Sequence, residues 1–148
     1  MKARHIYIPL AAGISTHWLV LLALESRYTS VLGRTMFKYM YLPVLESVLA
    51  TIPFAVLILA VALASAIGIK ELRLECVFWG GFIPAWGFSL FYYWLYWYPF
   101  YDPARPHISS TSAVALIFIP IRVMMYSAAG LAAGWLVSFL PVFRRAAK

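Results

Sequence analysis

Four long apolar runs, separated by short polar stretches, dominate the pattern of hydrophobic and polar positions along the chain. The runs cover residues from about 6 to 24, 43 to 67, 76 to 98 and 112 to 140. Crossing a hydrocarbon core of about 30 Å takes roughly 20 mostly apolar residues as a helix, because lipid offers the backbone no hydrogen-bond partners. The pattern therefore predicts an all-α integral membrane protein, with four transmembrane helices in a small bundle that forms one domain over residues 1–148.

The polar stretches between the runs constrain the arrangement of the helices. The charged turn at residues 68–75 is short, so the second and third helices are expected to be adjacent and antiparallel. The fourth run would measure about 43 Å as a helix, so we expect it to tilt, kink or protrude. The first run follows Lys2 and Arg4 and resembles a secretory signal, but it is long for one and has no small-x-small cleavage site nearby. We therefore expect a retained helix.

Residues 26–42, between the first two runs, have a different pattern. If this segment is helical, Arg27, Arg34 and Lys38 fall on one side and mostly apolar residues fall on the other. Such a pattern is typical of an amphipathic helix that lies in the membrane interface with its basic side toward lipid headgroups. A central glycine and the Ser and Thr content are as typical of an irregular loop, so both interpretations stay open.

Composition excludes a soluble protein, because 64% of the residues are hydrophobic, 11% are charged and the mean hydropathy is +0.85. The net charge of +7 would suggest nucleic-acid binding in a soluble protein. Here the basic residues cluster at the ends of the apolar runs, where they set topology and meet anionic headgroups. We therefore expect membrane lipids as partners and no nucleic acid.

Lys and Arg are unevenly distributed between the two sides of the predicted bundle. The N-terminus, the 68–75 turn and the C-terminus together hold seven, whereas the 25–42 segment and the 99–111 loop hold four. Basic loops tend to stay in the cytoplasm. Both termini are therefore expected to be cytoplasmic, in a membrane that we interpret as a bacterial inner membrane.

Small residues at spacings of four mark the second and fourth runs. The second run has Ala60, Ala64 and Gly68, and the fourth has Ala129 with Ala133 and Gly130 with Gly134. Helices in lipid associate through close backbone approach, which small side chains permit. We expect these stripes to pack within one bundle, and contact with another subunit is the less favoured alternative.

Three ionisable residues lie inside apolar runs, where they are costly and therefore good functional candidates: His17, Glu46 and Arg122. Arg122 shares a helix side with Ala129 and Ala133, so it is expected to face protein rather than lipid. Glu46 lies on the small-residue side of its own run. If the second and fourth helices pack through those sides, Glu46 and Arg122 form an ion pair that fixes helix register, and a ligand or proton role is less favoured.

Cofactor and catalytic sites are not indicated by the sequence. His17 has the chemistry to bind haem or a metal, but no second histidine lies at its depth, so a hydrogen bond to another helix is favoured. Cys76 is the only cysteine, which excludes an internal disulfide and a thiolate metal cluster. Hydrolytic, zinc and phosphate-loop motifs are missing, so neither an enzymatic activity nor a cofactor is predicted. In the outer loop, Asp102, Arg105 and His107 are interpreted as solvated turn residues; if they act, Arg105 binds an anionic group.

Aromatic residues crowd the outer end of the third run. Besides Phe91, the aromatic residues there are Tyr92, Tyr93, Trp94, Tyr96, Trp97 and Tyr98. Trp and Tyr anchor helices at headgroup level, but an anchoring belt needs only one or two per helix. Because these rings cover every side of the helix, some must face neighbouring helices, a partner chain, a lipid tail or a bound cation held against the ring faces. We favour a partner protein or a tightly held lipid.

Two functions fit these features. The first is a non-catalytic accessory or scaffold subunit of a larger membrane protein complex, which packs through the small-residue stripes and the aromatic end. The second is a small dimeric carrier or ligand-binding membrane protein with a polar cavity around Glu46, Arg122 and His17. The length and number of spans resemble those of small multidrug carriers, but a cation carrier needs a buried unpaired carboxylate in its first span, where this chain has His17.

Overall fold

The computed structural model describes residues 1–28, 41–101 and 111–140. Four helices make up this part of the chain: α1 (Arg4–Tyr28), α3 (Tyr41–Ala66), α4 (Glu71–Tyr101) and α5 (Thr111–Val137). Each contains a stretch that is long and apolar enough to cross a membrane. The predicted fold class, an all-α bundle of four long apolar helices, is confirmed, and it is the architecture of a multi-pass integral membrane protein.

Helices α1 and α4 extend beyond both ends of the apolar runs that predicted them, whereas α5 ends at Val137, before the end of its predicted run at 140. Helix α4 begins at Glu71, inside the predicted 68–75 turn, because charged residues can continue a helix once it has left the hydrocarbon core. Gly68, with a φ of 81°, follows the end of α3 and reverses the chain. The predicted interfacial segment 26–42 is divided, because its first residues end α1 and its last begin α3. Residues 29–40 lie outside the described part.

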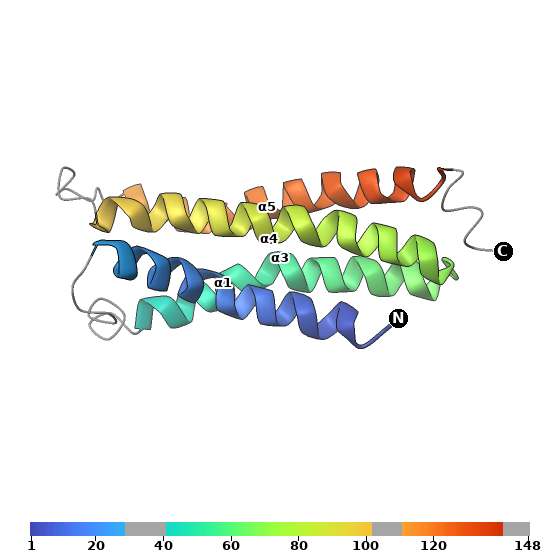
Figure 1. Cartoon of the computed structure of the whole chain (residues 1–148), viewed down its shortest axis with the longest axis horizontal. Coiled ribbons are helices and arrows are strands. Elements are labelled where there is room, and N and C mark those ends of the chain that lie inside the picture. The colour runs from blue at the N-terminus through green and yellow to red at the C-terminus, as the bar shows by residue number, and fades with distance from the viewer. Residues whose placement is uncertain (29–40, 102–110, 141–148) are drawn as a thin grey trace.

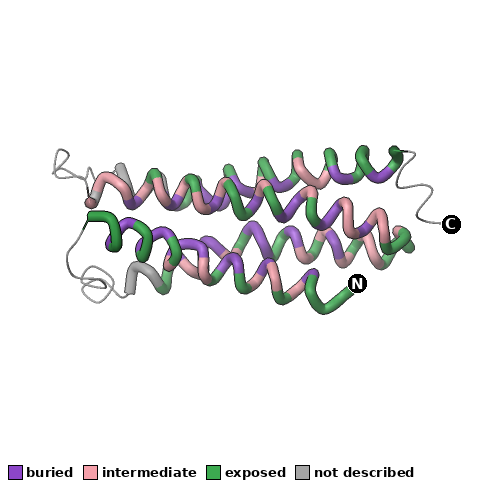
Figure 2. Tube along the Cα trace, in the orientation of Figure 1, coloured by how far each residue is buried: buried purple, intermediate pink, exposed green. Residues whose placement is uncertain are grey.

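The four helices run lengthwise along one another, and the start of α1 lies at the same end of the bundle as the end of α5 (Figure 1). Helices α3 and α4 run in opposite directions, as the short turn between them predicts. The most extensive contacts are those of α4 with α5 and of α1 with α3, and the contact of α1 with α4 is the largest that joins these two pairs. Buried positions line the inner sides of the helices (Figure 2), where Phe54, Leu57 and Phe78 are almost fully enclosed.

A glycine contact brings α4 and α5 together. A Cβ atom on Gly130 would lie 2.1 Å from the carbonyl oxygen of Gly80, and one on Gly134 would lie 2.3 Å from that of Cys76. The two backbones are therefore in direct contact, as glycines spaced by four residues permit in membrane helices. The predicted packing of Gly130 and Gly134 is made within the bundle, and the helix that receives them is α4.

The other predicted packing residues are placed differently. Ala60 and Ala64 are half-buried on α3, whereas Ala129 and Ala133 are exposed on α5. Gly68 is exposed, and a Cβ atom on it would meet nothing within 4 Å. The prediction that Gly68 packs against another helix is wrong, because the residue turns the chain after α3 instead.

An ionic cluster joins the N-terminal end of α1 to the start of α4. Glu75 accepts a hydrogen bond from Arg4 and lies 3.0 Å from Nε2 of His5, which is fully buried. Lys2 forms a salt bridge with Glu71 and lies 3.8 Å from the Glu75 carboxylate. The side chain of Glu75 is 16% exposed, whereas that of Glu71 is 65% exposed. The cluster therefore links α1 to α4 at the end of the bundle near the N-terminus.

Glu75→Ala is expected to lower the free energy of unfolding by about 1 kcal/mol, because it leaves the buried His5 ring nitrogen without its partner. Glu71→Ala is the matched control: its ion pair is solvent-exposed, so we expect no measurable change. Equilibrium unfolding of the full chain in detergent measures both. Equal effects of the two substitutions would contradict the structural role given to Glu75.

Candidate functional site

A carboxyl group is buried between three helices at the end of the bundle opposite the N-terminus. Glu46 lies five residues after Tyr41, the first residue of α3, and is fully buried. The indole Nε1 of Trp97, on α4, donates a hydrogen bond of 2.7 Å to its Oε2 atom. The hydroxyl of Tyr93, also on α4, donates to the backbone carbonyl of Glu46 at 3.4 Å. The Oε1 atom of Glu46 has no hydrogen-bond partner among the described residues.

The side chain of His17, on α1, is also fully buried, and it contacts Ser47, the residue that follows Glu46. Its Nδ1 atom lies 3.2 Å from the hydroxyl of Ser47, which also accepts a hydrogen bond of 3.0 Å from Nε1 of Trp18. The His17 ring lies 6.3 Å from the ring of Tyr93, measured between centroids. The hydrogen bond to another helix that we predicted for His17 is therefore made to α3. Its Nε2 atom has no partner in the described part of the chain.

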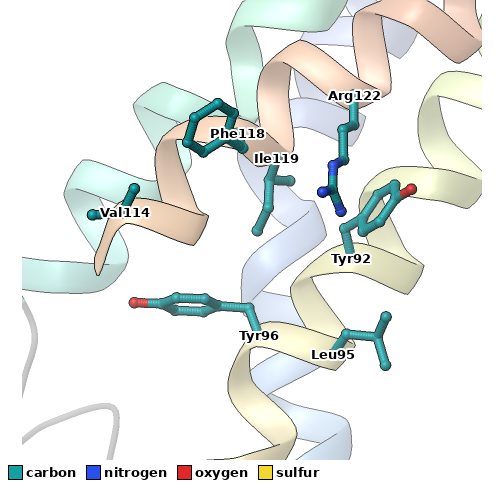
Figure 3. Close-up of a pocket in the computed structure, with 7 residues that line it drawn as sticks. All are labelled: Tyr92, Leu95, Tyr96, Val114, Phe118, Ile119 and Arg122. Carbon is teal, nitrogen blue, oxygen red and sulfur yellow. The ribbon is translucent and has the colours of Figure 1, made fainter. Parts of the chain in front are cut away.

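Arg122 lines a groove between α4 and α5 (Figure 3). Its side chain is exposed, and its guanidinium carbon lies 5.6 Å from the centroid of the Tyr92 ring. The Tyr92 hydroxyl donates a hydrogen bond of 3.4 Å to that of Tyr126. The groove has a volume of about 400 Å³ and is lined by Tyr92, Leu95, Tyr96, Val114, Phe118, Ile119 and Arg122. It combines one cation with an otherwise aromatic and aliphatic wall.

The predicted ion pair between Glu46 and Arg122 is not formed. The salt bridges of the described residues involve neither side chain, because Glu46 is held by Trp97 and Arg122 lies over Tyr92. The prediction that Arg122 faces protein is also wrong for the single chain. Helix α5 is rotated about its axis so that its glycines pack on α4. This rotation leaves Arg122 at the edge of the contact between the two helices.

Most residues of the predicted aromatic interface pack against other helices of the bundle. Tyr93 and Trp97 are almost fully buried and contact Glu46. The other four are half-buried against the core: Tyr92, Trp94, Tyr96 and Tyr98. The ring of Tyr98 meets that of Tyr28 on α1 at 5.8 Å, edge to face. Neighbouring helices therefore account for many of the rings beyond those that an anchoring belt requires.

Sequence reasoning missed several polar partners in this region. Ser47 and Trp18 complete the contacts of His17, and the buried Glu25 accepts a hydrogen bond of 3.4 Å from the hydroxyl of Tyr101. The adjacent Glu46 and Ser47, a polar pair in an otherwise apolar run, were the signal that could have revealed the first of these partners.

The described polar groups of this region include a carboxyl group, an imidazole and a guanidinium, which can bind protons or anions. Over the residues that the structure describes, no group of three or more His, Cys, Asp or Glu side chains could hold a metal ion. The predicted outer-loop residues Asp102, Arg105 and His107 lie outside that part of the chain. No protein-family model, curated protein or solved structure matches this sequence.

Proposed function

We propose that the protein is a non-catalytic accessory subunit of a larger membrane protein complex, and that it docks through α5 onto a transmembrane helix that carries a carboxylate. The observation that carries this proposal is the exposed side chain of Arg122 within a membrane-spanning helix. Arg122 lies eleven residues after Thr111, which corresponds to about 16 Å of helix rise. The residue lies within Leu116–Val137, the part of α5 that is long and apolar enough to cross a membrane.

An exposed guanidinium at this depth needs a partner. Placing Arg at the centre of a transmembrane helix costs about 3 kcal/mol on scales of membrane insertion, and such residues usually face protein. The described residues that line the groove beside Arg122 offer it an aromatic ring but no acidic side chain. A carboxylate is the group that matches a guanidinium best, because the two form paired hydrogen bonds. An acidic residue on a second chain would therefore neutralise Arg122.

The rest of the same helix side is suited to receive another helix. Ala129 and Ala133 lie within about 20° of Arg122 on a helical projection, and both are exposed. Small residues at this spacing allow close approach of two backbones. The neighbouring Gly130 and Gly134 are already used against α4, so the alanines form a second and separate packing side.

The alternative function, a carrier with one polar cavity around the three ionisable residues, has less support. Glu46 and His17 are enclosed between α1, α3 and α4, whereas Arg122 lines a groove between α4 and α5. These residues therefore belong to two places in the bundle. A cation and a carboxylate that do not share a cavity cannot act together on one substrate.

Arg122→Leu is expected to lower the recovery of a partner at least about tenfold, because truncating one member of a buried charge pair costs about 2–5 kcal/mol. The full chain, purified from its own membrane in mild detergent, is analysed by mass spectrometry for stoichiometric partners. Because the side chain is exposed, the variant is expected to keep the fold, which its unfolding midpoint checks.

Two adjacent alanines provide the matched control. Ala129→Leu adds bulk to the side that carries Arg122, whereas Ala128→Leu adds the same bulk about 120° away, and both residues are exposed. We expect loss of the partner in the first variant and retention in the second. A wild-type chain that purifies alone, or a partner that Arg122→Leu retains in full, would overturn the proposed function.

A further inference from the structure

Two buried polar atoms, one on α1 and one on α3, lack a hydrogen-bond partner within the described part of the chain. Each has the chemistry to be the partner of the other. Oε1 of Glu46 and Nε2 of His17 have no hydrogen-bond partner among the described residues, and both side chains have an exposed fraction of 0%. Polar groups that are fully buried are nearly always hydrogen-bonded, so such exceptions require an explanation. The two residues are connected through Ser47, which follows Glu46 in sequence and contacts His17 at 3.2 Å.

The hydrogen bonds around His17 favour one position for its ring proton. The indole of Trp18 can only donate, so it occupies an acceptor site on the Ser47 hydroxyl. If the Ser47 hydroxyl donates its hydrogen bond to Nδ1 of His17, Nδ1 carries no proton and the neutral ring carries its proton on Nε2. Nε2 is then a donor without an acceptor, and Oε1 of Glu46 is an acceptor without a donor. The two atoms are chemically complementary.

Among the residues that the structure describes, no positively charged side chain forms a salt bridge with Glu46. The described part of α4 contributes the titratable groups Tyr93 and Tyr96, both of which interact electrostatically with Glu46, and α1 contributes His17. Helix α5, which also packs on α3, provides Arg122, but this residue forms no salt bridge with Glu46. An isolated carboxylate in an apolar interior is so costly that the group takes up a proton instead.

We infer that Glu46 is a reversible proton-binding site, and that His17 is the positioning residue that stabilises its unloaded form. In the loaded form the carboxyl group is neutral and carries the proton itself, while Oε2 keeps its hydrogen bond from Trp97. In the unloaded form the O–H bond of the carboxyl group breaks, the proton passes to water or hydroxide, and the carboxylate accepts hydrogen bonds from Trp97 and from Nε2 of His17, directly or through one water molecule.

The position of Glu46 allows this exchange without passage across the whole membrane. The residue lies five positions from the start of α3, or about 8 Å of helix rise. Its proton therefore exchanges with the aqueous phase at the end of the bundle opposite the N-terminus. The site joins three helices, so its protonation state is linked to the packing of α1, α3 and α4 at that end.

Infrared spectroscopy of the full chain in lipid bilayers tests this inference directly. The protein has only five acidic side chains, so few carbonyl bands compete. We expect the carbonyl stretch of a protonated carboxylic acid at neutral pH, a shift of that band in deuterated water, and its reversible loss at alkaline pH. Glu46→Gln, which keeps the size of the side chain and an acceptor for Trp97, is expected to abolish the band.

Two other glutamates serve as controls. Glu25→Gln changes the other carboxyl group that is fully buried among the described residues, and Glu75→Gln changes one that is bonded to Arg4 and His5. The band assigned to Glu46 should survive both substitutions. Because His17 stabilises the unloaded form, His17→Phe should retain the band under alkaline conditions that remove it from the wild-type protein. A wild-type protein without the band, or a band that survives Glu46→Gln, would overturn the inference.

Discussion

Gly130→Ala is expected to lower the free energy of unfolding by about 3 kcal/mol, at the upper end of the usual cost of overpacking. The added methyl group would lie 2.1 Å from the carbonyl oxygen of Gly80, which is far closer than two nonbonded atoms can approach. The obstacle is backbone, so no side-chain rotation relieves it. Helices α4 and α5 must move apart along the most extensive contact in the bundle. Thermal or denaturant unfolding of the full chain in detergent measures the loss.

Gly87 provides the matched control for this substitution. It lies inside the same helix as Gly80, but a Cβ atom on it would meet nothing within 4 Å. Alanine is the better helix former by about 1 kcal/mol, so Gly87→Ala should leave stability unchanged or raise it slightly. If Gly130→Ala unfolds at the wild-type midpoint, the glycine contact does not hold α4 against α5.

The fold could be predicted from the sequence because its strongest constraint acts on each helix alone. Lipid requires every spanning segment to satisfy its own backbone, so an apolar run of sufficient length identifies a helix without knowledge of its neighbours. Which helices pack against one another is not determined by each helix alone. The spacing of Gly130 and Gly134 predicts which side of α5 packs closely, but it contains no information on which helix provides the complementary surface. Gly80, on α4, provides that surface.

The candidate site was predictable only in part for a similar reason. His17 and Glu46 stand out as ionisable residues in apolar runs, and both are buried. Whether Glu46 meets Arg122 or Trp97 depends on the rotation of each helix about its axis. The aromatic residues near Trp97 cover every side of α4, so their pattern has no preferred direction from which that rotation could be inferred. The contact between Glu46 and Trp97 therefore required the structure.

Trp97→Phe is expected to lower the free energy of unfolding by about 2 kcal/mol. Phenylalanine keeps an aromatic ring at this buried position but removes the indole donor, so Oε2 of Glu46 loses its hydrogen bond of 2.7 Å. Leaving a buried acceptor without its partner costs about 1–3 kcal/mol. Since Oε1 already has no partner in the described part of the chain, the whole carboxyl group would then be unsatisfied there.

Trp94 makes this expectation specific to the hydrogen bond. It lies three residues earlier on α4, is half-buried, and donates no hydrogen bond to another described residue. Trp94→Phe makes the same change in size, so it should cost clearly less than Trp97→Phe in the same unfolding experiment. Equal losses would mean that indole volume, rather than the bond to Glu46, stabilises this end of α4. If only Trp97→Phe lowers the free energy of unfolding, the hydrogen bond from Trp97 to the Glu46 carboxyl group stabilises the packing of α3 against α4.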